Sequence, residues 1–204
     1  MITLYRAPFS TNVERVALAL AHKRLEVESV VIDYSDRSAV VEASGQGLVP
    51  VIDDGGVVVS DSLAILRHLE ERHPEPALFP REPARRAELD VFLDWFERVW
   101  KLPPNAIEAE LASETPDEER IARLAALMDE RLDLFERMLT GRDHLFGELS
   151  AADVYSFPFL KYTRSREPDD EELFHRVLDE HQSFGAGRPR LAEWIERIDA
   201  LPRA

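Results

Sequence analysis

The chain has 204 residues, of which 40 are acidic and 25 basic, giving a formal net charge of −15. Such an acidic chain argues against binding to duplex nucleic acid, which needs a basic face to displace counterions. The sequence contains no Cys, which excludes disulfides, thiolate nucleophiles and zinc–thiolate sites.

The remaining composition predicts no metal site and no membrane partner. His68 and His73 are five residues apart, a spacing that places them on different faces of a helix. No run approaches the roughly 18 uninterrupted apolar residues of a membrane span. The N-terminus reads directly into a strand and shows no signal peptide, so we expect a cytoplasmic protein.

The first part of the chain predicts a βαβ unit. Residues 2–6 alternate as in a strand, residues 7–12 form a loop, and residues 13–20 carry apolar side chains at helical spacing. The run from Val27 to Ile32 predicts a buried parallel strand. A strand, a helix and a strand within about 30 residues are typical of a right-handed βαβ unit.

A proline then opens the next predicted strand, at Val49-Pro50-Val51-Ile52. Proline cannot donate to a sheet ladder and is confined to edges, strand starts or bulges. A cis Val49–Pro50 bond costs only about 0.5–1 kcal/mol and would leave the backbone of Val49 facing outward as a clamp for a peptide. The alternative is a trans proline that simply opens a buried strand.

The segment after residue 34 predicts two strands and a helix. Residues 35–48 are expected to be irregular or briefly helical. Strands at 50–53 and 57–59 are joined by an Asp-Gly type turn and form a hairpin. An amphipathic helix follows at about 61–73, and its start offers free N–H groups and a positive dipole end.

Beyond a Pro-rich stretch at 74–83, only helices are predicted. Apolar stripes mark helices at 89–100 and 121–139, a weaker acidic helix is expected around 170–182, and a last stripe runs from 191 to 198. Pro103-Pro104 must kink or end the first of these helices. Ser150-x-x-Asp153 after Gly147 is a capping box with Asp in place of the usual Glu, and it starts a helix that contains Pro158.

Together, V-P-V-I, a Gly-containing turn and an acidic residue followed by Ser at a helix start resemble the glutathione site of the cytosolic glutathione transferases. The Ser150-x-x-Asp153 box resembles the N-capping motif of that family's second domain. The resemblance implies an α/β plus all-α protein, with a thioredoxin-like domain (βαβ-ββα) at 1–75, a linker at 76–83 and an all-helical domain at 84–204. It covers the whole chain and suggests a bacterial member with a Ser-type site.

In Ser-type members, a Ser at the start of the first helix bonds the glutathione sulfur, and Ser10 stands at that place. A thiol of pKa about 8.5 is only about 3% ionised at pH 7, and lowering that pKa by two units takes about 2.7 kcal/mol. One charge-assisted hydrogen bond plus a helix N-terminus could supply this stabilisation. The alternatives are that Ser10 only caps the helix, or that Asn12 is the donor.

The resemblance implies a glutathione site formed by Phe9, Gln46, Leu48, Val49, Pro50, Asp61 and Ser62. Asp61 would hold the ammonium group of the ligand and Ser62 its γ-glutamyl carboxylate. Leu48 stands where relatives often have a Lys for the glycine carboxylate, and Gln46 is the candidate substitute. Ala7 stands at the Cys position of thiol-type relatives, which rules out disulfide exchange through that residue.

Four aromatic residues are candidates for an apolar pocket that receives the electrophile: Tyr5, Trp95, Trp100 and Tyr162. The alternative for each is a place in the core. The implied function is a glutathione-dependent transferase, with glutathione as co-substrate and no metal, that adds the thiolate to a small apolar electrophile in detoxification. A non-catalytic adaptor with this fold, and a glutathione-dependent isomerase or dehalogenase, are the competing interpretations.

The resemblance also implies a homodimer. The expected helices at 61–73 and 83–102 bear mixed charge (His68, Glu71, Arg72, Arg85 and Arg86), which suits either an interface or a solvated face.

Overall fold

The structure, a computed structural model, describes residues 1–164, 166–182 and 187–204, and its contacts divide the chain into two units. Unit 1 comprises Met1–Pro80 together with Leu201–Ala204, and unit 2 comprises Arg81–Ala200. Within the described ranges, no helix combines the length and the apolar character needed to cross a membrane.

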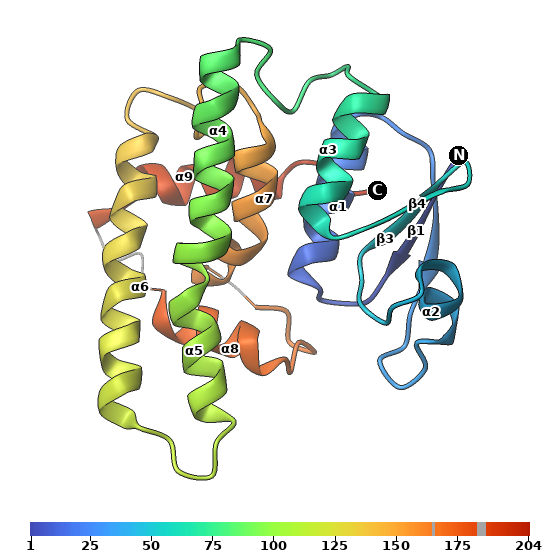
Figure 1. The fold of residues 1–204 in the computed structure, drawn as a ribbon. Helices are drawn as coiled ribbons and strands as arrows, with labels where there is room; N and C mark the ends of the chain where they lie inside the picture. Colours follow the sequence, from blue (N-terminus) through green and yellow to red (C-terminus); the bar gives the residue numbers. More distant parts are fainter. Residues whose placement is uncertain (165, 183–186) are drawn as a thin grey trace. The chain divides into compact units, whose positions relative to one another are not determined.

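Unit 1 is a four-stranded mixed sheet with helices on both faces (Figure 1). Its elements are β1 (Ile2–Arg6), α1 (Thr11–His22), β2 (Val27–Val31), α2 (Ser38–Ser44), β3 (Val51–Asp54), β4 (Val57–Ser60) and α3 (Ser62–Arg72). The strand order is β2-β1-β3-β4, with β1 parallel to β2 and antiparallel to β3. This βαβ-ββα order confirms the predicted thioredoxin-like unit.

The core of unit 1 lies between the sheet and the pair α1 and α3, which run side by side in Figure 1. The side chains of α1 and α3 that carry the predicted apolar stripes are fully buried: Val13, Val16, Ala17, Leu20, Ile65, Leu66 and Leu69. On the other face, Val40 of α2 packs with Ile32 and Val51. The helical periodicity of the sequence therefore identified the core faces of both helices correctly.

The expectation that residues 27–32 form a buried strand is wrong in one respect. β2 is parallel to β1 as predicted, but it is one of the two edge strands of the sheet, and Val31 is 66% exposed. Glu28 and Ser29 are exposed as well. An edge strand has a neighbouring strand on one side only, so its side chains are less covered than those of a central strand. Which strand lies at an edge depends on distant segments of the chain.

The Val49–Pro50 bond is cis, as the sequence suggested, and β3 begins directly after it. Val49 packs against the small cluster of Ile32, Val40 and Val51, which fixes this bend on the sheet. The hairpin then turns at Gly55 and Gly56, both with positive φ, and the side chain of Asp53 accepts a hydrogen bond from Gly56 N. β3 is therefore bounded by a defined bend at each end, the cis proline before it and the turn after it.

A buried ion pair between Lys23 and Glu70 holds the segment that follows α3 against α3 and the end of α1. Lys23 Nζ donates to Glu70 Oε2 at 2.8 Å, to the His73 carbonyl at 2.7 Å and to the Pro76 carbonyl at 3.0 Å. Glu70 in turn accepts a bond from Leu78 N at 3.0 Å. The Pro-rich stretch is thus bonded to α1 and α3 along part of its length, and the structure divides the chain after Pro80.

The last residues of the chain also pack on unit 1. Ala204 N donates to the Ala17 carbonyl at 3.1 Å, and Arg6 donates to the carbonyl oxygen of Ala204 at 2.9 Å. Arg203 forms an ion pair with Glu14 at 3.0 Å. These contacts join β1 and α1 to the C-terminal residues.

Four side chains meet at the end of β3. Oδ2 of Asp54 lies 2.9 Å from His68 Nε2, 3.0 Å from Arg72 Nε and 3.5 Å from His73 Nε2. The expectation that His68 and His73 point to different helix faces is wrong, because α3 ends at Arg72 and His73 turns back to the same carboxylate. Burial alone would raise the pKa of Asp54, but the bond from His68 and the nearby charges lower it overall.

We expect Asp54→Asn to lower the free energy of unfolding by about 1–3 kcal/mol at pH 7, because the bonds to a charged acceptor are lost. A carboxylate whose pKa is depressed on folding stabilises the protein above its unfolded pKa, near 3.8. That contribution begins to fall near pH 3.8 and disappears as the pH falls through the lower pKa of the folded state, so the two proteins should converge only below that lower pKa. Denaturant unfolding between pH 7 and pH 3 measures this, with the exposed Glu28→Gln as the control; equal stabilities at pH 7 would contradict the role of Asp54.

Among the residues that the structure describes, the regular elements of unit 2 are all helices. Its elements are α4 (Pro83–Trp95), the π-helical turn η1 (Phe96–Trp100), α5 (Leu102–Leu111), α6 (Glu118–Met138), α7 (Ala151–Leu160), the short η2 (Lys161–Thr163), α8 (Leu173–His181) and α9 (Pro189–Asp199). α4, η1 and α5 follow one another as a column beside the long α6 (Figure 1). The two prolines at 103 and 104 lie in the first turn of α5, where missing N–H groups cost little, so the first helix ends before them as predicted.

The predicted capping box is present at the start of α7. Asp153 has no exposed surface, and its two carboxylate oxygens accept bonds from Ser150 N, Ser150 Oγ, Leu145 N and Trp194 Nε1, all at 2.8–2.9 Å. One side chain thereby joins the start of α7 to the preceding loop and to α9. Burial raises the pKa of Asp153, while these hydrogen bonds act in the opposite direction.

Candidate functional site

Three segments of unit 1 carry the residues that the sequence singled out for binding and activating glutathione. They are the loop before α1, the segment 46–50 before β3, and the start of α3. The first two of these segments line a shared pocket, and a buried arginine on α1 connects the first to the third, as described below.

Ser10 is the N-cap of α1. Its Oγ accepts a hydrogen bond from Val13 N at 3.3 Å, and its backbone is extended, with φ −70° and ψ 113°. A hydroxyl that accepts a bond still has its own hydrogen to donate. The capping role and a bond from Ser10 to a sulfur are therefore compatible, and the positive end of the helix dipole favours an anion at this place.

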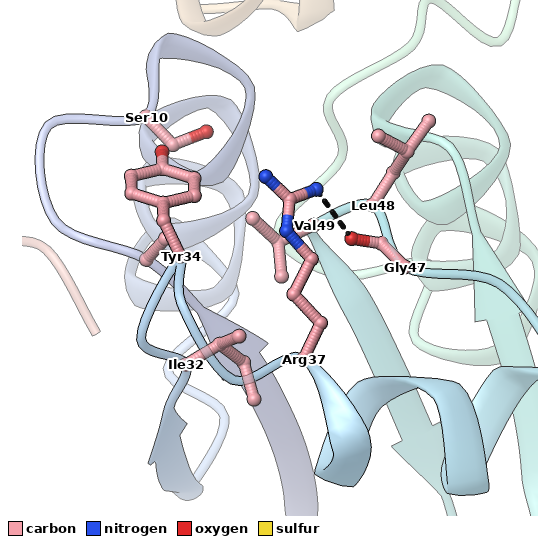
Figure 2. A pocket seen from close by; sticks show the side chains of 8 residues that line it. Ser10, Ile32, Tyr34, Arg37, Gly47, Leu48 and Val49 are labelled. Carbon is pink, nitrogen blue, oxygen red and sulfur yellow. Dashed lines mark hydrogen bonds between the residues drawn. The ribbon is translucent and has the colours of Figure 1, made fainter.

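A pocket of about 190 Å³ opens beside Ser10 (Figure 2). Its walls are mostly apolar, and three side chains bring polar groups to it: Ser10, Tyr34 and Arg37. The other lining residues are Ala7, Ile32, Gly47, Leu48 and Val49. Val49, which precedes the cis proline, thus lines the same pocket as the N-cap of α1.

The start of α3 is connected to the start of α1 through Arg15. Arg15 is 1% exposed, and its Nη1 donates to Asn12 Oδ1 at 2.8 Å and to Ser62 Oγ at 3.2 Å. Because Ser62 accepts this bond, its own hydroxyl hydrogen is turned away from the arginine. Asn12, the other candidate donor, has its carbonyl oxygen in use by the same guanidinium.

Asp61 adopts a backbone conformation that L-residues rarely use. Its φ is 76° and its ψ is 125°, while its side chain accepts a bond from Ala64 N at 2.9 Å as the N-cap of α3. A non-glycine residue held in such a region costs on the order of 1–3 kcal/mol and is often found at functional sites. The carboxylate of Asp61 is exposed and adjoins Ser62.

Gln46 and Leu48 do not provide a cation or a free amide to the pocket. The side-chain amide of Gln46 donates to the Leu48 carbonyl at 2.9 Å and to Ser44 Oγ at 3.2 Å, and its oxygen accepts a bond from Leu48 N. Leu48 is 70% exposed. The amide of Gln46 therefore shapes the loop before the cis proline.

The structure places the aromatic candidates in different surroundings. Trp100 is 1% exposed and stacks on Phe96 with 4.6 Å between ring centroids, and Tyr162 is 2% exposed and donates to Asp170. Tyr5 and Trp95 are partly exposed, Tyr5 against the sheet cluster of unit 1 and Trp95 beside Phe92. Phe9, in the loop before α1, has φ 57° and is 41% exposed.

Sequence reasoning missed Arg15, Tyr34 and Arg37. Arg15 stands among the apolar residues Val13, Val16 and Ala17 of α1, and a basic residue in that apolar run was a readable signal. Tyr34 and Arg37 stand in the connection after β2, which carries no motif.

In the described parts of the chain, no group of three or more His, Asp or Glu side chains is arranged to hold a metal ion.

The fold and the site together define a thioredoxin-like unit with a pocket beside a helix N-cap, followed by a helical unit. Models of the glutathione S-transferase N-terminal domain and C-terminal domain match residues 4–77 and 118–197. The chain is 29% identical to the glutathione S-transferase GstB of Escherichia coli over 212 residues, which cover 99% of this chain and 95% of that protein. It is 33% identical to FtsZ-localized protein A of Caulobacter vibrioides over 168 residues, which cover 74% and 72%.

Solved structures show the same fold. A glutathione S-transferase from Rhodospirillum rubrum superposes with a TM-score of 0.73 at 25% identity, covering 98% of this chain and 88% of that one. The Tau class enzyme of mango superposes with a TM-score of 0.79 at 19% identity, with the same coverage. The chain belongs to the glutathione S-transferase superfamily. It is accordingly a glutathione transferase, and this family uses glutathione as its co-substrate.

Proposed function

We propose that this transferase activates the thiol of glutathione at Ser10 and adds the thiolate to a small apolar electrophile. The observation that supports this proposal is the position of Ser10, whose hydroxyl lies at the N-terminus of α1 and lines the pocket next to Val49. The thiol loses its proton to solvent, Ser10 donates a hydrogen bond to the sulfur, and the sulfur lone pair forms the new bond to carbon. The electron pair of the bond that breaks at this carbon leaves with the displaced group, or in an addition moves onto the electrophile, which then takes up a proton from solvent. Ser10 itself forms no covalent bond.

The γ-glutamyl end of glutathione belongs, in this proposal, at Asp61 and Ser62. The carboxylate of Asp61 attracts the ammonium group, and the hydroxyl of Ser62 donates to the carboxylate of the ligand. Arg15 is the positioning residue here, because its bond to Ser62 Oγ directs that hydroxyl hydrogen toward the ligand. Phe9, Val49 and Pro50 contribute contacts to the peptide part of the ligand.

For the electrophile, Trp100 and Tyr162 offer almost no surface and are not part of the proposal. Tyr5 and Trp95 retain partly exposed side chains and remain candidates. A cytoplasmic location and a role in detoxification fit this chemistry, because the reduced thiol of glutathione is maintained in the cytosol.

The experiment that tests the function is binding to glutathione. We expect retention on immobilised glutathione and a rise in the melting temperature with millimolar glutathione, followed by turnover in conjugation assays across a panel of electrophiles. The absence of both retention and a thermal shift would overturn the proposed activity.

A non-catalytic binding role is the second candidate. The observation that favours it is the 33% identity to a protein named for its localisation with FtsZ. Binding of glutathione with no turnover against any electrophile would favour this candidate, whereas turnover would exclude it.

We also propose a homodimer, which rests on the family. Two of the charges expected at its interface, His68 and Arg72, bind Asp54 within the chain. If the protein is a homodimer, sedimentation at micromolar concentration gives a mass near twice 23.3 kDa. A mass of one chain under those conditions would contradict the dimer.

A further inference from the structure

The basic side chains of the chain are distributed unevenly between its interior and its surface. Of the 25 basic residues, 22 are arginine and three are lysine: Lys23, Lys101 and Lys161. Lysine ordinarily lies at the surface of a folded protein. Here none of the three lysines is among the exposed residues, so the cationic side chains that the chain exposes are guanidinium groups.

The ammonium group of each lysine is also occupied or shielded. Lys23 has no exposed side-chain surface, and its ammonium donates to one carboxylate and two carbonyl groups. The side chain of Lys101 is 14% exposed. Its Nζ donates to Glu97 Oε1 at 2.7 Å and lies 5.2 Å from the centre of the Phe159 ring. Lys161 is half-buried, with its Nζ 5.3 Å from the centre of the neighbouring tyrosine ring.

The six histidines follow the same pattern, because none of them is among the exposed residues. His68 and His73 lie against the carboxylate of Asp54. His175 is buried, and its Nδ1 lies 2.8 Å from Asp170 Oδ2. With no Cys in the sequence, the chain therefore exposes no thiol, no lysine and no imidazole side chain.

These three kinds of side chain are the ones that electrophiles attack most readily. A thiolate, an uncharged amine and an imidazole each present a lone pair that can form a bond to carbon. A guanidinium group stays protonated in proteins and lacks such a lone pair. An arginine at the surface therefore provides the positive charge of a lysine without its nucleophile.

We propose that this distribution protects the enzyme from covalent attack by its own substrates, an inference that rests on the proposed function. The electrophile is then one that attacks amines and imidazoles as well as thiols, because only such a compound would damage exposed lysines and histidines. A 1,2-dicarbonyl compound lies outside this class. It condenses with guanidinium groups, and it would modify the arginines that the surface carries.

Acrolein, an α,β-unsaturated aldehyde, is the probe for this proposal. The lone pair of an amine forms a bond to the β carbon of acrolein, and the electron pair of the C=C bond moves toward the carbonyl group. The α carbon then takes up a proton from solvent, and the nitrogen releases one. Each addition raises the mass of the protein by one molecule of acrolein, and peptide mapping by mass spectrometry locates it.

After exposure to excess acrolein, the wild-type protein should carry adducts mainly at the amino group of Met1, a residue that is 83% exposed. Its turnover, measured after the aldehyde is removed, should persist, and acrolein should itself be conjugated to glutathione. Phenylglyoxal, a 1,2-dicarbonyl compound, should instead modify several arginines of the same protein.

The matched control places lysines where the surface carries arginine. In the double variant Arg98→Lys/Arg123→Lys, the substituted side chains are 77% and 66% exposed in the wild type, and both lie on helices of unit 2. The introduced lysines should react with acrolein at least about tenfold faster than Lys101 or Lys161, because a shielded group reacts only when the structure opens locally.

Two outcomes would overturn the inference while leaving the proposed function intact. One is addition of acrolein to the native lysines or histidines as fast as to the introduced lysines. The other is a wild-type protein that conjugates other electrophiles but not acrolein. If the wild-type protein conjugates no electrophile at all, the proposed function fails and this inference fails with it, whatever the pattern of adducts.

Discussion

Replacing Asp153 with alanine is expected to lower the free energy of unfolding of unit 2 by about 3–5 kcal/mol. The carboxylate is fully buried and accepts four hydrogen bonds, from Leu145, from Ser150 twice and from Trp194. Its removal leaves buried N–H groups without an acceptor, and each such group retains its cost of desolvation. The loss also separates the start of α7 from α9, so local unfolding should extend beyond the cap.

Denaturant unfolding measures this effect. Asp143→Ala, which removes a carboxylate from an exposed side chain of the same unit, should change the stability by no more than about 0.5 kcal/mol. If Asp153→Ala does not fold, Asp153→Asn decides the question, because the amide keeps one acceptor but presents a donor to the donors of Ser150. A variant at position 153 as stable as the wild type would show that the capping box is dispensable.

Ser10→Ala is expected to lower turnover at pH 7 by roughly ten- to a hundredfold. The loss follows from ionisation, because a bound thiol whose pKa returns toward about 8.5 is only a few per cent thiolate at that pH. Affinity for glutathione should change little, since the sulfur carries little of the ground-state binding. Ser10→Thr keeps the hydroxyl and the helix cap, and it should recover most of the activity.

Ser62→Ala is the matched comparison, because it removes a hydroxyl from the other end of the ligand. The bond that Ser62 makes to a charged carboxylate is worth about 1.5–3 kcal/mol, so binding of glutathione should weaken about tenfold or more. The turnover of the saturated enzyme should stay close to that of the wild type. If both serine variants lose affinity and turnover in the same proportion, the separate roles assigned to Ser10 and Ser62 are wrong.

Local patterns accounted for most of the fold. The cis bond at Val49–Pro50, the box at Ser150 and Asp153, and the buried faces of α1 and α3 were all predicted, because each depends on residues within one or two turns. Exposure of β2 was not predicted, because it depends on the strand order of the whole sheet. The meeting of His68 and His73 at Asp54 depends on where α3 ends, and boundaries are the least readable feature of a helix.

The candidate site likewise contains residues that sequence motifs identify and residues whose role depends on how distant segments pack. Ser10, Val49, Asp61 and Ser62 stand in motifs that a resemblance can identify. Arg15 lies 47 residues before Ser62 in the chain, and its bond to that hydroxyl appears only once α1 and α3 are packed together. Arg37 likewise reaches Gly47 across a connection that carries no pattern of its own.

The ionisation of the bound thiol tests the central claim most directly. The ultraviolet absorbance of the thiolate, followed against pH with saturating glutathione, gives the thiol pKa in the complex for the wild type, Ser10→Ala and Ser62→Ala. We expect a pKa about two units below the ordinary 8.5 in the wild type and in Ser62→Ala, and a value near 8.5 in Ser10→Ala. A bound thiol pKa that is the same in Ser10→Ala as in the wild type would show that Ser10 is only a helix cap.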